Sequence, residues 1–210
     1  MLGIFGGTFD PIHYGHLRPL LEVRQALGLD EVRVIPCCLP PHRDMPSVSA
    51  EQRLAMLKLA VAERPGFVID ERELIRGGPS YMVDTLQSLR DELGVNKPLC
   101  LILGLDAFVS LDGWHEWQRL PELAHIVVMQ RPAGLLPKTG AVAELVEQAQ
   151  ALDVVELLQQ PAGRVYFQSV TQLGIAATAI REQLAHGRDV SFLLPDSVRH
   201  YIETNGLYRH

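Results

Sequence analysis

Short apolar segments alternate with longer amphipathic segments along the chain of 210 residues, and this alternation limits the choice of fold. The short segments have the length and the aliphatic character of β-strands. They lie at residues 2–5, 31–36, 67–70, 99–103, 125–130 and 164–168. Because strands this apolar must be covered on both faces, they favour a parallel sheet between two layers of helices. The sequence therefore predicts a doubly wound α/β fold with a mainly parallel sheet.

The segments between the strands carry signals that start and end helices. Helices are predicted at residues 16–28, 53–63, 81–94, 141–152, 178–187 and 196–206. A capping box that begins at Ser49 precedes the second helix, and Ser80 is the expected N-cap of the third, which Gly94 ends. No sharp boundary divides the chain. Residues 1–210 are therefore predicted to form a single domain, with a helical C-terminal part from about residue 178.

Charge and cysteine content exclude several classes of protein. The formal net charge of −6 argues against a broad nucleic-acid surface, and an anionic ligand would need local cations. The cysteines, Cys37, Cys38 and Cys100, suit neither a disulfide framework nor a paired zinc site, which favours a reducing cytoplasm. Neither a signal peptide nor a membrane-spanning helix is expected, because the sequence has no basic N-terminal segment before an apolar core and no apolar run of about 18 residues.

The segment GGTFDPIHYGHL at residues 6–17 joins the first predicted strand to the first helix. Ligands of open α/β sheets bind at such positions, where glycines admit a phosphate and helix N–H groups favour an anion. The segment is neither a Walker loop nor a GxGxxG fingerprint, and it contains no lysine. His13 and His16 are its candidate phosphate ligands, because imidazoles hydrogen-bond phosphate oxygens.

Two other interpretations of the histidine pair stay open. Both rings could simply cap or pack at the start of the helix. They could also bind zinc, but two histidines three positions apart need a third ligand, and only Asp10 is close in sequence. The spacing around Gly15, directly after GGTFDP, favours phosphate binding over both.

The same segment resembles the GxFxPxHxGH signature of the nucleotidyltransferase superfamily with the HxGH motif. Later segments narrow the resemblance to the bacterial nicotinate-mononucleotide adenylyltransferases. They are SYMVDTL at residues 80–86, GLDAFVSLDGWHEW at residues 104–117 and the C-terminal residues 194–208. Met82 stands where the family commonly has threonine. The resemblance covers nearly the whole chain and implies a Rossmann-like fold.

The resemblance also implies a reaction, in which the adenylyl group of ATP is transferred to nicotinate mononucleotide and pyrophosphate is released. The phosphate of the acceptor is largely ionised at neutral pH, so no general base is required. His16 is expected to contact the α-phosphate in the transition state, and His13 to help bind the triphosphate. Backbone N–H groups around Gly7, Thr8 and Phe9 are expected to line the same site. Mg²⁺ is the expected cofactor, held mainly by the phosphates.

Two further segments are expected to bind ATP. Thr178 and Arg181 match the family segment ISSTxIR, in which alanines replace both serines here. Ala176 and Ala177 remove two possible hydroxyl contacts, each worth about 0.5–1.5 kcal/mol where it is made, so the replacement permits weaker ATP binding and does not imply a loss of activity. Asp106 resembles the residue that accepts hydrogen bonds from the ribose, and Gly104 lets the nucleotide come close. Without the resemblance, Thr178 and Asp106 would be helix caps and Arg181 a surface charge.

The resemblance places the acceptor beside Trp114, which is expected to stack on the pyridine ring. Thr85 is expected to contact the nicotinate end, although an ordinary core threonine is the alternative. Arg131 is expected near the acceptor phosphate, and His42 and Arg43 belong to a loop near the phosphates. Trp117 is expected to be a packing residue.

Other functions stay open at this stage. Another phosphate acceptor, such as phosphopantetheine or nicotinamide mononucleotide, would keep the reaction class. A nucleotide-binding sensor without turnover and a zinc hydrolase that uses the histidine pair are the alternatives from other classes. The sequence makes no prediction about the oligomeric state.

Overall fold

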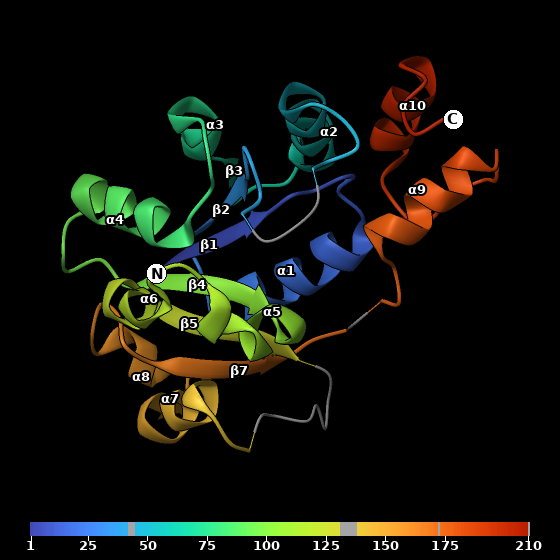
Figure 1. Ribbon diagram of the computed structural model, residues 1–210. Helices are drawn as coiled ribbons and strands as arrows, with labels where there is room; N and C mark the ends of the chain where they lie inside the picture. The colour runs from blue at the N-terminus through green and yellow to red at the C-terminus, as the bar shows by residue number, and fades with distance from the viewer. Residues whose placement is uncertain (42–44, 131–137, 172, 210) are drawn as a thin grey trace.

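The computed structural model describes residues 1–41, 45–130, 138–171 and 173–209. Within these residues, seven strands form one parallel sheet in the order β3-β2-β1-β4-β5-β7-β6 (Figure 1). The strands are β1 (Leu2–Gly7), β2 (Glu31–Pro36), β3 (Phe67–Ile69), β4 (Leu99–Gly104), β5 (His125–Gln130), β6 (Gln150–Ala151) and β7 (Val165–Ser169). The predicted doubly wound, Rossmann-like α/β fold is confirmed.

Helices cover both faces of the sheet (Figure 1). They are α1 (Tyr14–Ala26), α2 (Ala50–Val61), α3 (Arg72–Arg76), α4 (Met82–Leu93), α5 (Leu105–Val109), α6 (Leu120–Leu123), α7 (Ala141–Ala149), α8 (Val155–Leu158), α9 (Ala177–Ala185) and α10 (Asp196–Thr204), with 3₁₀ turns η1 (Leu111–Gly113) and η2 (Trp117–Arg119). None of these helices is long and apolar enough to cross a bilayer.

The helix signals in the sequence are confirmed with one exception. Ser49 and Gln52 form the predicted capping box of α2, and Gly94 ends α4 at a φ of 81°. Ser80, however, is not the N-cap of α4, because Tyr81 occupies that position. The Ser80 hydroxyl instead accepts a hydrogen bond from the backbone N–H of Cys38 at 2.8 Å.

Alternate residues of each central strand enter two separate cores. In β4, Cys100 and Ile102 pack toward the layer that contains α1, α2, α9 and α10, whereas Leu101 and Leu103 pack toward α4 to α7. Both sets are buried, as expected of a central strand in a parallel sheet. The apolar character of the strands is therefore explained by burial on both faces.

The sheet opens at its centre, between β1 and β4. The chain winds from β1 through β2 to β3 in one direction and from β4 onward in the other, so this is a topological switch point. Pairing of β1 with β2 continues to Gly7, but pairing with β4 ends at Ile4 and Leu101. The carboxyl ends of the two strands therefore separate, directly before the glycine-rich turn at residues 6–13.

Candidate active site

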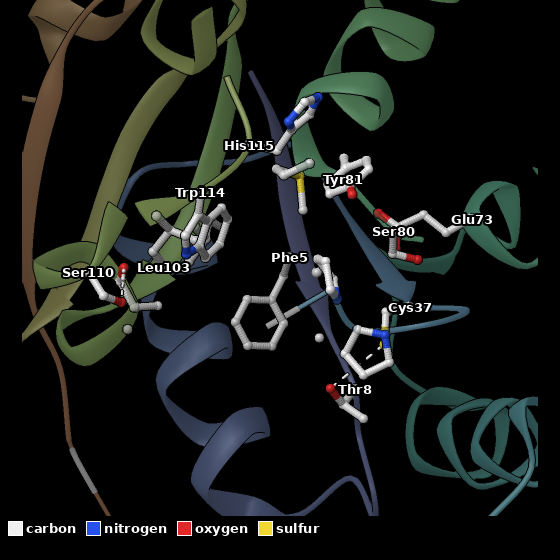
Figure 2. Close-up of a pocket in the computed structure, with 18 residues that line it drawn as sticks. Phe5, Thr8, Cys37, Glu73, Ser80, Tyr81, Leu103, Ser110, Trp114 and His115 are labelled. Carbon is white, nitrogen blue, oxygen red and sulfur yellow. Dashed lines mark hydrogen bonds between the residues drawn. The ribbon is translucent and has the colours of Figure 1, made fainter. Parts of the chain in front are cut away.

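A cavity of about 300 Å³ lies where β1 and β4 separate (Figure 2). One side is lined by Gly6 and Gly7 of β1 and by Gly104 of β4. The other lining residues include Phe5, Thr8, Cys37, Pro40, Pro41, Glu73, Ser80, Tyr81, Met82, Ala107, Ser110, Trp114 and His115. The cavity thus occupies the position at which open α/β sheets bind their ligands.

Hydrogen bonds to carbonyl oxygens fix the backbone of the glycine-rich turn. The Gly7 carbonyl accepts from the N–H of Cys37 at 3.0 Å, and the Thr8 carbonyl accepts from Arg53 at 2.8 Å. In a trans peptide the C=O and the following N–H point in opposite directions. The N–H of Thr8 therefore points away from β2, toward β4 and the cavity, and that of Phe9 points away from Arg53. These directions agree with the anion site predicted for this backbone, which stays a prediction.

Arg53 is a residue that the sequence reasoning missed. Its side chain is 1% exposed, and its guanidinium donates to the carbonyls of Thr8 at 2.8 Å, Cys37 at 2.8 Å and Cys38 at 3.1 Å. It ties the glycine-rich turn to the loop after β2 and places a positive charge behind the turn. A signal was available, because Arg53 lies one helical turn before the buried Leu57, on the core face of α2.

The predicted histidine pair lies at the start of α1. The rings of His13 and His16 stack with centroids 3.7 Å apart, and His16 also meets the edge of Phe9 at 5.5 Å. His13 is buried, and burial lowers its pKa to about 4, whereas His16 is half-buried. His13 occupies the N-cap position and is packed there, as the alternative interpretation has it, but its side chain makes no capping hydrogen bond.

The two predicted phosphate-binding segments come together in space. A Cβ atom on Gly15 would lie 2.8 Å from the carbonyl oxygen of Ile175, so only glycine fits between α1 and the segment that leads into α9. Arg181 donates to the carbonyl of Asp10 at 2.7 Å and lies 3.4 Å from the Thr178 hydroxyl. Figure 1 shows α9 beside the start of α1.

Thr178 and Asp106 do not cap their helices, so this alternative is wrong for both. The N-cap of α9 is Ala176, and that of α5 is Gly104. Both side chains are exposed. Gly104 lines the cavity, and a Cβ on it would meet no protein atom within 4 Å. Neither packing nor an unusual φ demands a glycine there, which agrees with the predicted approach of a nucleotide.

On the acceptor side, Trp114 lines the cavity, and the rings of Tyr81 and His115 lie 4.3 Å apart at its edge. Thr85 is completely buried and lies behind the lining residues, so a direct contact between its side chain and a ligand has no support here. Trp117 packs against the core beside α4 to α7. The predicted ligands His42, Arg43 and Arg131 lie outside the described residues.

Glu73 is a second residue that the sequence reasoning missed. Glu73 is 2% exposed and lines the cavity (Figure 2). Its carboxylate accepts a hydrogen bond from the Thr85 hydroxyl at 2.6 Å. Burial raises its pKa, and hydrogen bonds from Thr85 and Ser80 oppose that rise. Because Ser80 also accepts from the N–H of Cys38, Glu73 connects α3, α4 and the loop after β2. Helix α3 is too short for its sequence to show a buried face.

Among the described residues, no group of three or more His, Cys, Asp or Glu side chains is arranged to hold a metal ion. The polar groups in and around the cavity include backbone N–H groups, hydroxyls, imidazoles, a buried arginine and one buried carboxylate. Such a set suits a phosphorylated ligand that carries its own counter-ion.

Comparison with solved structures supports the fold. The nicotinic acid mononucleotide adenylyltransferase of Plasmodium falciparum, complexed with APC, matches with a TM-score of 0.72 at 17% identity, over 99% of this chain and 96% of that one. A putative nicotinate-nucleotide adenylyltransferase from Vibrio parahaemolyticus matches with a TM-score of 0.66 at 14% identity, over 100% and 95% of the two chains. At these identities the likeness shows a shared architecture.

Sequence comparison goes further. The model of the cytidylyltransferase-like family matches residues 4–183. A probable nicotinate-nucleotide adenylyltransferase from Methylococcus capsulatus is 54% identical over 209 residues, which cover 99% of both chains. One from Halorhodospira halophila is 52% identical over 99% of this chain and 94% of its own. The chain therefore belongs to the cytidylyltransferase-like family and, within it, to the nicotinate-nucleotide adenylyltransferases.

Proposed function

We propose that this enzyme transfers the adenylyl group of ATP to nicotinate mononucleotide, forming nicotinate adenine dinucleotide and pyrophosphate. The observation that carries the proposal is the cavity between β1 and β4, which the glycine-rich turn and Trp114 line together. The ring of His16 meets the ring of Phe5, which lines the cavity, with 6.3 Å between the two ring centroids. Relatives that carry this activity in their names, at 54% and 52% identity along almost the whole chain, support the same reaction.

The chemistry requires positioning more than proton transfer. The phosphate of the acceptor is already largely ionised near pH 7 and attacks the α-phosphorus in line with the departing pyrophosphate. His16 and the N–H groups of Thr8 and Phe9 donate hydrogen bonds to the α-phosphate as its charge develops. Arg181, in the middle of α9, stabilises the β- and γ-phosphates with its guanidinium.

His13 adds a donor that responds to the ligand. Burial keeps the ring neutral at pH 7, because it lowers the pKa to about 4. A nearby phosphate favours the charged imidazolium, so triphosphate binding raises the pKa of His13 again.

ATP would carry Mg²⁺ into the site, and phosphate oxygens and water rather than protein side chains would hold the ion. The lining residues fit an ion that is held by its own ligand. Glu73 is the one carboxylate among the described lining residues, and hydrogen bonds from Thr85 and Ser80 already engage it, so the phosphates would hold the ion. When bound, the ion neutralises phosphate charge.

The acid end of the acceptor finds a suitable environment at the start of α4. Ser80, Tyr81 and Met82 line the cavity, and α4 extends for 12 residues from Met82. The N–H groups and the dipole at such a helix start favour a carboxylate over a neutral amide. Trp114 provides the aromatic face for the pyridinium ring.

The proposal treats residues 1–210 as one nucleotidyltransferase domain that works in the cytoplasm. The strands among the described residues form one sheet, and the cavity lies at the ends of its central strands, which supports the first part. Cys37, Cys38 and Cys100 are free thiols, which suits a reducing compartment.

Pyrophosphate release from ATP tests the function, with nicotinate mononucleotide and, separately, nicotinamide mononucleotide as acceptors. The expected result is release with both ATP and the acid, at a kcat/KM at least tenfold higher than with the amide. Equal values would contradict the acid as the specific acceptor. Absence of release with either acceptor would contradict adenylyl transfer to pyridine mononucleotides.

A further inference from the structure

Asp10, in the middle of the glycine-rich turn, joins three distant parts of the chain. Its carboxylate accepts hydrogen bonds from the Tyr208 hydroxyl at 2.7 Å and from the backbone N–H of Ser47 at 2.7 Å. Its carbonyl accepts from the Arg181 guanidinium at 2.7 Å. Asp10 is 6% exposed, so these partners replace water around a buried charge.

Tyr208 is held in an unfavourable backbone conformation to make this contact. Its φ is 62°, in the left-handed region that bulky residues rarely adopt, and the side chain is 6% exposed. Burial and the Asp10 carboxylate raise the pKa of its hydroxyl, so the hydroxyl stays a donor. The hydrogen bond spans 198 positions of sequence, so it connects the C-terminal segment to the turn after the first strand.

The turn itself is strained beside Asp10. Phe9 has a φ of 50°, and a Cβ on Gly7 would lie 2.9 Å from the Phe9 ring. Residues in such conformations persist only when their neighbours hold them. On one side Arg53 holds the carbonyl of Thr8, and on the other Tyr208 and Ser47 hold the carboxylate of Asp10.

We infer that Asp10 and Tyr208 form a positioning pair that fixes the turn for ATP and sets the direction of Arg181. The inference rests on the proposed function, because it assumes that ATP phosphates bind to this turn. Neither residue touches substrate in this account. Without the Tyr208 hydroxyl, one buried oxygen of Asp10 loses its donor, and the turn and Arg181 gain alternative positions that misplace the phosphate donors.

The test uses Tyr208→Phe, Asp10→Asn and the double variant, with Tyr201→Phe as the control. Tyr201 is a partly buried tyrosine of α10 that packs on the same core, so it reports the effect of losing a phenol hydroxyl elsewhere. The dissociation constant of ATP without acceptor is measured by calorimetry, and KM and kcat for both substrates by pyrophosphate release. All measurements are made at a temperature well below the thermal unfolding midpoint of each variant.

Tyr208→Phe is expected to weaken ATP binding about tenfold and to leave the KM of the acceptor within twofold, while Tyr201→Phe matches the wild type. The double variant is expected to be no worse than Asp10→Asn alone, because the residues act as a pair. Unchanged ATP binding in Tyr208→Phe, equal losses for both substrates, or fully additive effects would each overturn the inference.

Wild-type protein that binds ATP but does not release pyrophosphate would contradict the proposed function alone, whereas wild-type protein that does not bind ATP would contradict both.

Discussion

At the residue scale, His13 is the least obvious feature of the candidate site. It is 4% exposed, and its ring stacks on the ring of His16. A polar ring in such a position loses free energy of solvation, and burial accordingly lowers its pKa to about 4. If ATP binds beside this ring as proposed, the charge of the ring depends on the ligand. A phosphate supplies the opposite charge that makes protonation favourable.

We expect ATP to raise the pKa of His13 by at least one unit, because a nearby phosphate stabilises the imidazolium. NMR titration of the ring protons, with and without ATP, measures this shift. His125 is the matched control: its pKa is also lowered by burial, but its ring nitrogens are engaged by the backbone of Gln160 and Arg164. A His13 pKa near 4 in both titrations would contradict contact with the triphosphate.

Gly104→Ala is expected to weaken ATP binding tenfold or more and to leave the unfolding midpoint nearly unchanged. The new methyl group would meet no protein atom within 4 Å and would enter the cavity at the end of β4. Gly113→Ala is the control, since a Cβ there also meets no protein atom and Gly113 does not line the cavity. Calorimetry with ATP compares the two variants. Equal ATP affinities would mean that the nucleotide does not approach Gly104.

At the scale of elements, α3, the start of α4 and the loop after β2 meet at one buried carboxylate. Glu73 accepts from Thr85 in α4, and Ser80 connects it to Cys38 in the loop. Arg76 of α3 in turn donates to the Thr85 hydroxyl at 3.2 Å. The side of the cavity assigned to the acceptor therefore depends on this network more than on any single lining residue.

Glu73→Gln is expected to raise the KM for nicotinate mononucleotide about tenfold and to leave the KM for ATP within twofold. An amide offers one acceptor oxygen where the carboxylate offers two, so either Thr85 or Ser80 loses its partner. Glu71→Gln is the control, because this partly exposed acid pairs with Lys58 and does not line the cavity. Steady-state kinetics with each substrate varied in turn separates the effects. A larger rise for ATP than for the acceptor would contradict the assigned arrangement.

The longer helices and strands could be predicted from the sequence, because each pattern used, such as an apolar run or a capping box, has a single physical cause. The predicted strand at 31–36 has the bounds Glu31–Pro36, and α2 begins at the predicted capping box. Elements such as α3 and α8 were missed, because four or five residues do not complete a repeat of hydrophobic spacing.

The candidate site residues also divide into those that the sequence indicated and those that it did not. Gly104 and Trp114 could be placed at the cavity from the sequence because they belong to contiguous motifs, and the roles predicted for His13 and His16 from such a motif stay predictions. Buried polar partners were missed, since Arg53, Glu73 and Tyr208 acquire their roles from contacts with residues 12 to 198 positions away. For Thr85 the motif is present, but packing turns its hydroxyl toward Glu73, so the alternative of a core threonine is confirmed and its contact with the acceptor stays a prediction.

At the scale of the whole molecule, the switch point places the site where two cores and two directions of winding meet. Buried polar groups near this centre couple the stability of the fold to pH. Burial lowers the pKa of both His13 and His125, so the unfolded chain binds protons more readily than the folded chain at these positions. Glu73 acts in the opposite direction, because burial raises its pKa.

The free energy of unfolding is expected to be constant between about pH 7 and pH 8 and to fall as the pH drops below 6.5, the ordinary pKa of histidine. At alkaline pH it falls again, because burial raises the pKa of the Cys37 and Cys100 thiols. His13 alone, with a pKa near 4 in the folded state, accounts for a loss of roughly 3 kcal/mol by pH 4. Urea unfolding at pH 7.5, 6, 5 and 4.5 measures the loss. The exposed His200→Gln variant should follow the wild-type curve. A free energy that stays constant down to pH 4.5 would contradict buried, neutral histidines.

The central claim is that the turn after β1 is the phosphate site and that His16 acts there, and the turnover of His16→Ala tests it most directly. Pyrophosphate release from ATP and nicotinate mononucleotide is measured together with the urea midpoint of the variant. Removal of one donor to the transition state is expected to lower kcat by about 100-fold or more, with the midpoint retained. A correctly folded His16→Ala enzyme that turns over at the wild-type rate would contradict the account.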